Sequence, residues 1–179
     1  MDDPIPSNPN HHPTLEADDV PAMICTIHLT SHGHRFGPST PPKVAGLPIH
    51  KVLQYDIRSL PNPPKLVRAQ QTGLHKSLRE WFFSRPEAAA KMEEVSAAVD
   101  AALADLPTSE CGAEIHVVVF CEMGKHRSVA FIEELARRPF FVATASGRQK
   151  CGVVVQHRDV ARAKHDARSR RQRVDRSES

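Results

Sequence analysis

Apolar and polar residues follow two different periodicities along the chain, and these periodicities predict strands separated by helices. Three segments rich in β-branched and aliphatic residues are expected to form strands, and a fourth segment, nearly all apolar, is expected to be a strand covered on both faces. The first three segments are 23–30, 49–57 and 152–157, and the apolar one is 115–120.

Two further segments carry apolar residues at helical spacing. The first predicted helix begins near residue 86 and ends near residue 106, and the second covers 128–138. The apolar faces consist of Met92, Val95, Val99 and Leu103 in the first helix, and Val129, Ile132 and Leu135 in the second. Two Ser-x-x-Glu segments, 77–80 and 84–87, predict capping boxes at helix starts. The segment 140–150 shows no pattern that assigns it.

Strands that alternate with helices predict an α/β fold with a mostly parallel sheet flanked by helices. The length of 179 residues fits a single domain, which we place at 22–160. The acidic, proline-rich segment 1–21 is predicted to be a disordered head. The basic segment 161–179 is predicted to be a disordered or helical tail.

Charge and cysteine usage narrow the class of protein. The formal net charge is only +3, but the stretch 162–176 holds seven Lys/Arg against two Asp. None of the four cysteines forms a C-x-x-C pair, which argues against a zinc ribbon, and no apolar run is long enough for a membrane span or a signal peptide. We therefore expect a cytoplasmic protein with reduced thiols, and a nuclear location stays open.

The segment 121–128, Cys-Glu-Met-Gly-Lys-His-Arg-Ser, connects the apolar strand to the second helix and predicts an anion-binding turn. The first N–H groups of a helix lack internal acceptors, and the helix dipole favours negative charge there. Gly124 permits an unusual backbone conformation, and Ser128 is suited to cap the helix. Three consecutive residues, Lys125, His126 and Arg127, add positive charge. The turn is therefore expected to hold a phosphate group.

The spacing Cys-x5-Arg-Ser also matches the phosphate loop of cysteine-dependent phosphatases. In that alternative, Cys121 is the nucleophile and Arg127 cradles the transferred phosphoryl group. Such loops usually carry more glycine, and the sequence offers no clear aspartate as general acid, with Asp56 and Asp159 as the conceivable ones. A thiol phosphatase and a purely structural turn with a buried Cys121 remain alternatives to a binding turn.

Five short motifs occur together in this chain. They are TSHGHRFG at 30–37, DIRSLPNP at 56–63, Thr72-Gly73, the cysteine turn through Val129, and His157-Arg158-Asp159. Their order and spacing resemble the C-terminal domain of the RapZ family of bacterial RNase adapter proteins, over about 24–160. The resemblance implies an α/β domain that senses glucosamine-6-phosphate, in proteins that bind small RNA and present it to an endoribonuclease.

The resemblance also implies roles for individual residues. Met123, Gly124, His126 and Arg127 would hold the phosphate, while the HGHRFG loop and the Asp56/Arg58 pair would close around the sugar. With the turn's other residues, the candidate ligand-binding set is Met123, Gly124, Lys125, His126, Arg127, Ser128, His34, Arg35, Asp56 and Arg58. No Walker A loop occurs, so the chain is expected to be this domain without the P-loop kinase-like N-terminal domain, and ATP or GTP binding is not inherited.

Three of the motifs follow predicted strands, after Thr30, after Ile57 and after Phe120, so we expect them to meet in one pocket at the carboxyl ends of a parallel sheet. We expect a phosphorylated small molecule as ligand and a binding rather than a catalytic role. Asp56 and Arg58 project to the same side of a strand end, so mutual pairing is an alternative to ligand contact. Eleven histidines make chance pairs common, so no metal site and no cofactor are predicted. The tail either contacts RNA phosphates or is merely solvated; the tail residues concerned are Arg162, Lys164, Arg168, Arg170, Arg171 and Arg173. Self-association stays open.

Overall fold

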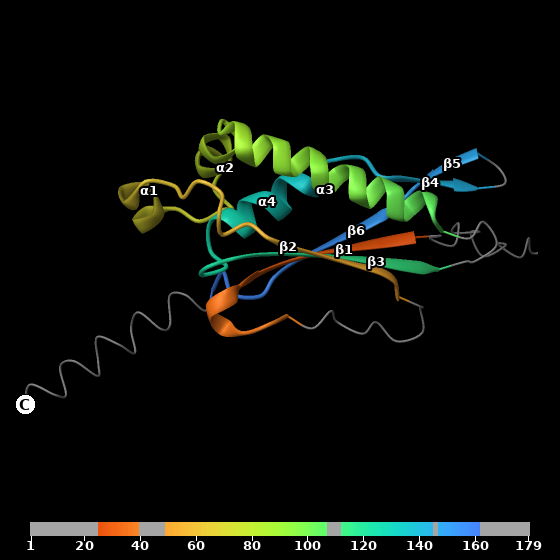
Figure 1. Cartoon of the computed structure of the whole chain (residues 1–179), viewed down its shortest axis with the longest axis horizontal. Coiled ribbons are helices and arrows are strands. Elements are labelled where there is room, and N and C mark those ends of the chain that lie inside the picture. The colour runs from red at the N-terminus through yellow and green to blue at the C-terminus, as the bar shows by residue number, and fades with distance from the viewer. Residues whose placement is uncertain (1–24, 40–48, 107–111, 145–146, 162–179) are drawn as a thin grey trace, which may run out of the picture.

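Four parallel strands form the sheet on which the molecule is built (Figure 1). The structure is a computed structural model that describes residues 25–39, 49–106, 112–144 and 147–161. The spatial order of the strands is β2-β3-β1-β6, and every neighbouring pair is parallel. Their bounds are β1 Cys25–Gly33, β2 Ile49–Asp56, β3 Ala113–Cys121 and β6 Gly152–His157. The predicted α/β fold with a mostly parallel sheet is confirmed.

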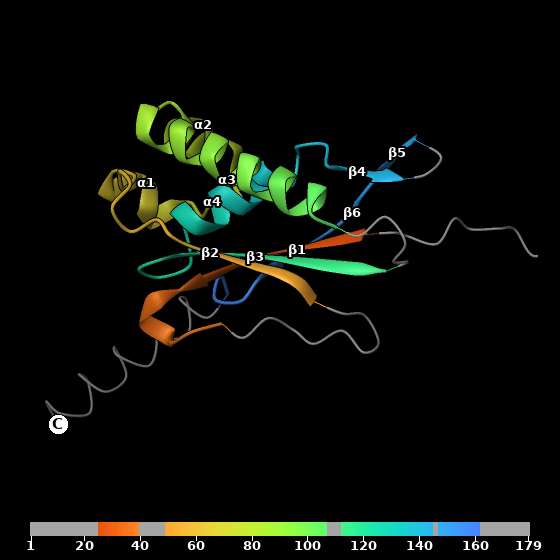
Figure 2. The ribbon, with the colours of Figure 1, turned by 45° about the vertical axis from the view of Figure 1, so that its right-hand side comes forward.

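The described α-helices gather on one face of this sheet, as Figures 1 and 2 show. Their bounds are α1 Lys65–Gln70, α2 Lys76–Phe83, α3 Pro86–Ala104 and α4 Arg127–Leu135. Helix α4 contacts β1, β3 and β6, whereas α3 contacts β2 and β3, so two helices cover the four strands. The short 3-10 helix η1 (His34–Phe36), which directly follows β1, lies on the other side of the sheet in Figures 1 and 2.

Side-chain alternation divides each central strand between the two faces of the sheet. In β1 and β3, the residues that face the helices are fully buried aliphatic side chains such as Ile27, Leu29, Ile115 and Val117. The seven apolar residues predicted to form the buried faces of α3 and α4 are all buried, so both predicted helical faces are confirmed. The expected burial of 115–120 on both faces is also found, except that Phe120 at the strand's end is half-buried.

Both predicted capping boxes are wrong. Ser77 lies inside α2, and its Oγ donates to Gln71 Oε1 at 2.8 Å instead of capping the helix. Ser84 Oγ donates to the carbonyl oxygen of Trp81. Helix α3 begins at Pro86, so its N-cap is Arg85 and not Ser84. The fixed φ of proline suits a helix start without any side-chain cap.

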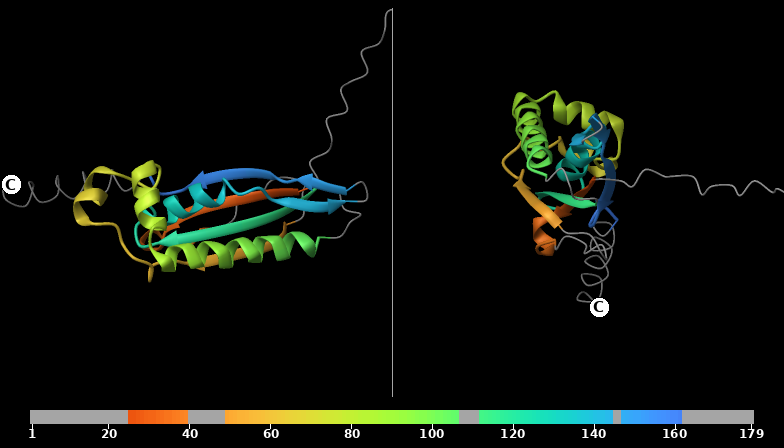
Figure 3. Two further views of the ribbon diagram at one scale, coloured as in Figure 1. Left: turned by 90° about the horizontal axis from the view of Figure 1, so that it is seen from above. Right: turned by 90° about the vertical axis from the view of Figure 1, so that its right-hand side faces the viewer.

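The segment that the sequence left unassigned forms a β-hairpin of β4 (Phe141–Thr144) and β5 (Gly147–Lys150). Seen from above in Figure 3, this hairpin lies at the end of the sheet opposite α1 and α2. Strand β1 continues to Gly33, three residues beyond its predicted end, because it pairs with β3 up to Cys121. The predicted head and the basic tail beyond residue 161 lie outside the described residues.

Candidate anion-binding site

The carboxyl ends of β1, β2 and β3 meet at one edge of the sheet, as expected for parallel strands. The register pairs Gly33 with Cys121 and Asp56 with Phe120. Beyond the strands, Arg35 N donates to the carbonyl oxygen of Glu122 at 3.1 Å. The segments that follow these strands are called here the first loop (34–39, after β1), the second loop (57–64, after β2) and the third loop (122–126, after β3). The third loop and the residues on either side of it contact the other two loops.

Two glycines allow the first and third loops to touch. Gly124 adopts a φ of +61°, a conformation that favours glycine. A Cβ at Gly124 would lie 2.6 Å from the carbonyl carbon of His32 and closer still to Gly33 N, and a Cβ at Gly33 would lie 2.6 Å from the carbonyl carbon of Met123. These neighbours are backbone atoms, so neither loop accommodates a side chain at Gly33 or Gly124.

A third glycine connects the turn to the segment between α1 and α2. Gly73 N donates to the carbonyl oxygen of Lys125 at 3.0 Å. A Cβ at Gly73 would lie 2.7 Å from Val129 Cβ and closer still to Ala130 N. Arg79 holds this segment in place, since its Nη1 donates to the carbonyl oxygens of Gly73 and Leu74 at 3.3 and 2.6 Å. The Thr72-Gly73 motif therefore packs directly on the start of α4.

The first turn of α4 leaves backbone donors without acceptors. The helix begins at Arg127 with His126 as N-cap, and no side chain caps it. The first helical hydrogen bond runs from Ala130 N to the carbonyl oxygen of His126 at 2.8 Å. The N–H groups of Arg127, Ser128 and Val129 therefore have no acceptor among the described residues, which is the electrostatic condition for anion binding.

Ser128 is not the N-cap that the sequence predicted. It lies inside α4, where its Oγ is 3.2 Å from Cys121 Sγ and donates to the carbonyl oxygen of His32 at 3.4 Å. Both Ser128 and Cys121 are buried. The Ser128 hydroxyl therefore ties the helix to β1 and β3 and leaves the first turn uncapped.

The guanidinium group of Arg127 is directed at the second loop. Its Nη1 donates to the carbonyl oxygens of Arg58 and Leu60 at 2.6 and 2.7 Å, and the residue is only 8% exposed. Sequence analysis placed Arg127 among the ligand contacts, and the structure shows that it fixes the segment after β2. A direct contact between Arg127 and the ligand stays a prediction.

His126 contributes a hydrogen-bonding group rather than a charge. Its Nε2 lies 3.1 Å from the carbonyl oxygen of Arg68, so this nitrogen carries the proton. Burial lowers the pKa of His126 to about 4, which keeps the imidazole neutral at pH 7. The positive charges at the turn are therefore those of Arg127, Lys125 and Arg35. Of these, Lys125 and Arg35 have side chains without a hydrogen bond or ion pair among the described residues.

Asp56 and Arg58 pair with each other, which was the alternative to ligand contact in the sequence analysis. Arg58 Nε and Nη2 donate to Asp56 Oδ2 at 2.9 and 2.7 Å, and this pairing lowers the pKa of the Asp56 carboxyl. The Arg58 guanidinium carbon also lies 5.8 Å from the centre of the Phe120 ring, on which His34 stacks at 5.9 Å. Sequence reasoning did not identify Phe120 as part of the site. The only indication in the sequence was that an aromatic residue stands near the end of an otherwise aliphatic strand.

The geometry does not favour the phosphatase alternative. The Cys121 side chain is 3% exposed and contacts Ser128, whereas a thiol nucleophile needs access to its substrate. Arg127, the expected phosphoryl clamp, donates to two backbone carbonyls of the neighbouring loop. Asp159, one conceivable general acid, is buried and accepts a hydrogen bond from Gly33 N at 2.9 Å.

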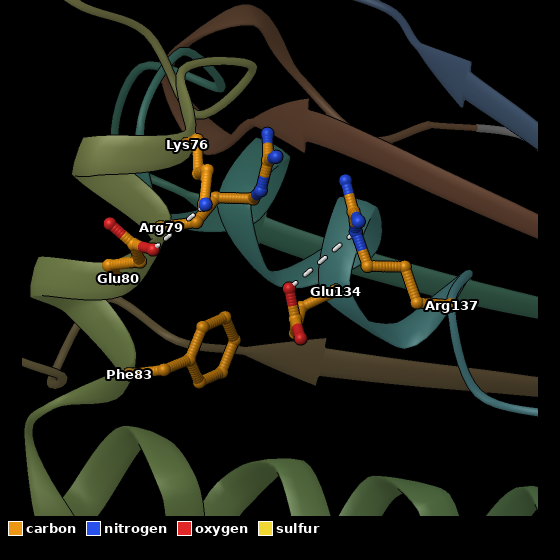
Figure 4. Close-up of a pocket in the computed structure, with 6 residues that line it drawn as sticks. All are labelled: Lys76, Arg79, Glu80, Phe83, Glu134 and Arg137. Carbon is orange, nitrogen blue, oxygen red and sulfur yellow. Dashed lines mark ion pairs between the residues drawn. The ribbon is translucent and has the colours of Figure 1, made fainter.

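A separate cavity of ≈ 450 Å³ lies between α2 and α4 (Figure 4). Its charged side chains pair within the wall, with Lys76 Nζ 3.6 Å from Glu80 and Arg137 Nε 3.7 Å from Glu134. Phe83 provides an apolar side of the cavity. The cavity thus presents no set of unpaired donors comparable to the start of α4.

Two further predictions concern parts of the chain away from this site. The six tail residues proposed for RNA contact are beyond the described residues. Among the helices that the structure describes, none is both long and apolar enough to cross a membrane.

Comparison with known proteins places the chain among the relatives of one family. Residues 25–161 match the family model described as RapZ C-terminal domain. Over 137 residues the chain is 34% identical to a nucleotide-binding protein of Geobacter sulfurreducens, covering 75% of this chain and 41% of that protein. A nucleotide-binding protein of Acidothermus cellulolyticus is 33% identical over 146 residues, covering 81% of this chain and 42% of the relative. The chain thus spans less than half the length of these relatives.

Proposed function

The chain belongs to the RapZ C-terminal domain family, and we propose that it binds a phosphorylated small molecule at the carboxyl ends of β1, β2 and β3. The observation that carries the proposal is the uncapped start of α4, where the N–H groups of Arg127, Ser128 and Val129 lack acceptors. Such a helix start is suited to a phosphate group. The relatives named nucleotide-binding proteins support a phosphorylated ligand.

In this proposal the phosphate contacts the backbone of 123–128, and side chains from two loops neutralise its charge. Lys125 and Arg35 supply that charge together with the guanidinium of Arg127, whereas His126 is neutral at pH 7. Arg127 acts as a positioning residue, since it fixes the segment at Arg58 and Leu60.

An amino-sugar phosphate such as glucosamine-6-phosphate fits the charges around the site. Asp56 is held in its ionised form by Arg58, and Glu122 is exposed within the turn. Carboxylates of this kind accept hydrogen bonds from sugar hydroxyls and attract an ammonium group. The Glu122 carboxylate, which Arg58 does not pair, would also repel a ligand that carries only negative charge. We therefore place an amino-sugar phosphate ahead of a nucleotide.

A thermal-shift series on the full chain tests the ligand class. The compounds are glucosamine-6-phosphate, glucose-6-phosphate, glucosamine, adenosine monophosphate and inorganic phosphate. A ligand present at 100 times its Kd adds about 2.7 kcal/mol of stability, which raises the melting temperature by roughly 5–11 °C. We expect the largest shift with glucosamine-6-phosphate and none with glucosamine. If no phosphorylated compound shifts the melting temperature, the proposal is wrong.

Replacement of Lys125 tests the position of the site. Lys125→Gln removes one charge from a half-buried position in the turn, and we expect the Kd for glucosamine-6-phosphate to rise about 5- to 10-fold. Lys150→Gln is the matched control, because Lys150 is an exposed lysine in the hairpin at the opposite end of the sheet. Equal affinities of the two variants would place the phosphate elsewhere.

The phosphatase alternative is an outcome of a parallel assay. Hydrolysis of an aryl phosphate by the wild-type chain, lost in Cys121→Ser, would replace the binding proposal with a thiol phosphatase. We expect no hydrolysis above background in either protein.

We propose RNA contact by the segment 162–179 as a second function, because this segment holds seven Lys/Arg against two Asp and one Glu. Charge alone should give affinity that falls steeply with salt and reads little sequence. The test compares the full chain with a chain ending at residue 161 in a filter-binding or anisotropy assay. Equal RNA affinity of the two chains would reject the role of the tail.

A further inference from the structure

We propose that His28, Glu114 and His116 form a binding site for a divalent cation of the Zn²⁺ class. The three residues come from β1 and β3, the two central strands of the sheet. The register pairs His28 with His116, and Glu114 lies two residues before His116 on the same face. This face is turned away from helices α1 to α4.

The potential ligand atoms of these residues lie close together. His28 Nε2 lies 3.4 Å from Glu114 Oε1, and His116 Nε2 lies 3.0 Å from Glu114 Oε2. One ligand atom from each residue lies within 4.8 Å of the other two. Zinc bonds to nitrogen and oxygen are about 2.0–2.2 Å long, so atoms bound to one zinc ion lie roughly 3–4 Å from one another. The separations in this cluster are of that order.

Burial and a nitrogen without a hydrogen-bond partner indicate that the cluster can accept a ligand. His28 is 8% exposed, while Glu114 and His116 are each 1% exposed. His28 Nε2 is buried without a hydrogen-bond partner and is directed at the Glu114 carboxylate. A buried polar atom of this kind is uncommon, because leaving it unsatisfied is unfavourable. A cation would satisfy it and would neutralise the carboxylate at the same time.

Two imidazoles and one carboxylate select the type of cation. Imidazole nitrogen suits Zn²⁺ and similar transition metals, whereas Mg²⁺ and Ca²⁺ prefer sites made of oxygen atoms. Three protein ligands leave one coordination position for a water or a small anion. The imidazole rings of His28 and His116 now stack at 4.6 Å between centres and 14° between planes. One of them must turn for both Nε2 lone pairs to meet the ion.

This metal site is separate from the candidate anion-binding site. His28 precedes Gly33 by five strand residues, which corresponds to roughly 16 Å along β1. The ion would link the two central strands near the middle of the sheet. Loss of metal binding therefore tests this inference without reference to the function proposed above.

The experiment measures zinc binding by the untagged full chain. After dialysis against a chelator, we expect titration with Zn²⁺ to give one bound ion per chain by elemental analysis. Glu114→Gln keeps the shape of the side chain but removes its charge, and His116→Gln removes one nitrogen ligand. Each should weaken binding by more than about 100-fold, since even indirect partners of a metal contribute about 10- to 100-fold.

Two controls separate this site from the other histidines. His50→Gln changes an exposed histidine of β2, and a His11→Gln/His12→Gln double variant removes the adjacent pair near the N-terminus. Both should bind zinc as the wild type does. Co²⁺ added to the double variant should give the intense visible bands of a four-coordinate site, which tests the inference even if Glu114→Gln and His116→Gln fail to fold. The inference is overturned if a folded Glu114→Gln variant still binds zinc as the wild type does. It is also overturned if Co²⁺ gives no such bands with the His11→Gln/His12→Gln variant.

Discussion

Replacement of Gly124 by alanine should destabilise the chain more than any other single methyl group added to the three loops. The φ of +61° at Gly124 disfavours alanine by about 1–2 kcal/mol. The new Cβ would also meet the backbone of His32 and Gly33, and such overpacking adds about 1–3 kcal/mol. We expect a total loss of about 2–5 kcal/mol, which corresponds to a melting temperature lower by roughly 4–20 °C.

Gly37 provides a matched control for this substitution. Gly37 also has a positive φ, +82° with ψ of 174°, but a Cβ there would meet nothing within 4 Å. Gly37→Ala therefore carries the backbone strain without the steric clash, about 1–3 kcal/mol. Both variants are compared by urea unfolding and by thermal shift with glucosamine-6-phosphate. Should Gly124→Ala prove no less stable than Gly37→Ala, the close approach of the first and third loops would be refuted.

Two further predictions follow from buried groups at the site. The folded state keeps the pKa of His126 near 4 against an ordinary 6.5, so the unfolded chain binds a proton first and stability should fall as the pH falls from about 6.5 to about 4. The loss is at most about 3 kcal/mol and smaller where solvent screens the half-buried ring, and it should be reduced in His126→Gln, as melting curves across this pH range would show. Arg127→Ala removes two hydrogen bonds to backbone carbonyls and should lower the free energy of unfolding by about 2–4 kcal/mol in urea titrations. The exposed Arg137→Ala should change it by less than about 0.5 kcal/mol, and equal effects of the two variants would contradict the assigned role of Arg127.

The candidate site shows what local pattern can and cannot predict. The apolar run 115–120 followed by a glycine-containing basic turn was enough to place an anion-binding turn between a strand and a helix. Parallel strands that each end in a polar motif were enough to bring the three loops together. The roles of the basic residues were not predictable in this way. Arg127 turns toward the carbonyls of Arg58 and Leu60, and His126 donates to Arg68, 58 residues earlier in the chain.

Helix starts depended on competing hydrogen bonds that the sequence does not reveal. Ser77, Ser84 and Ser128 each fit the residue type of an N-cap, yet each hydroxyl finds a different acceptor or contact in the folded chain. A capping pattern predicts only that a side chain could accept a hydrogen bond from a nearby backbone N–H group. The acceptor that is used depends on which segments fold against the helix.

The sequence by itself determined the order of the four sheet strands and of α3 and α4, the apolar faces of these two helices, and the special backbone conformation of Gly124. These features depend on periodicity and on backbone conformation, which act over a few residues. Only the tertiary structure decided that Arg127 supports a neighbouring loop, that His126 is neutral, and that His28 lies beside Glu114 and His116. The last arrangement requires the register of β1 against β3, and a shift of one residue would turn His28 to the other face. Contacts between distant segments follow from that register, which local pattern does not specify.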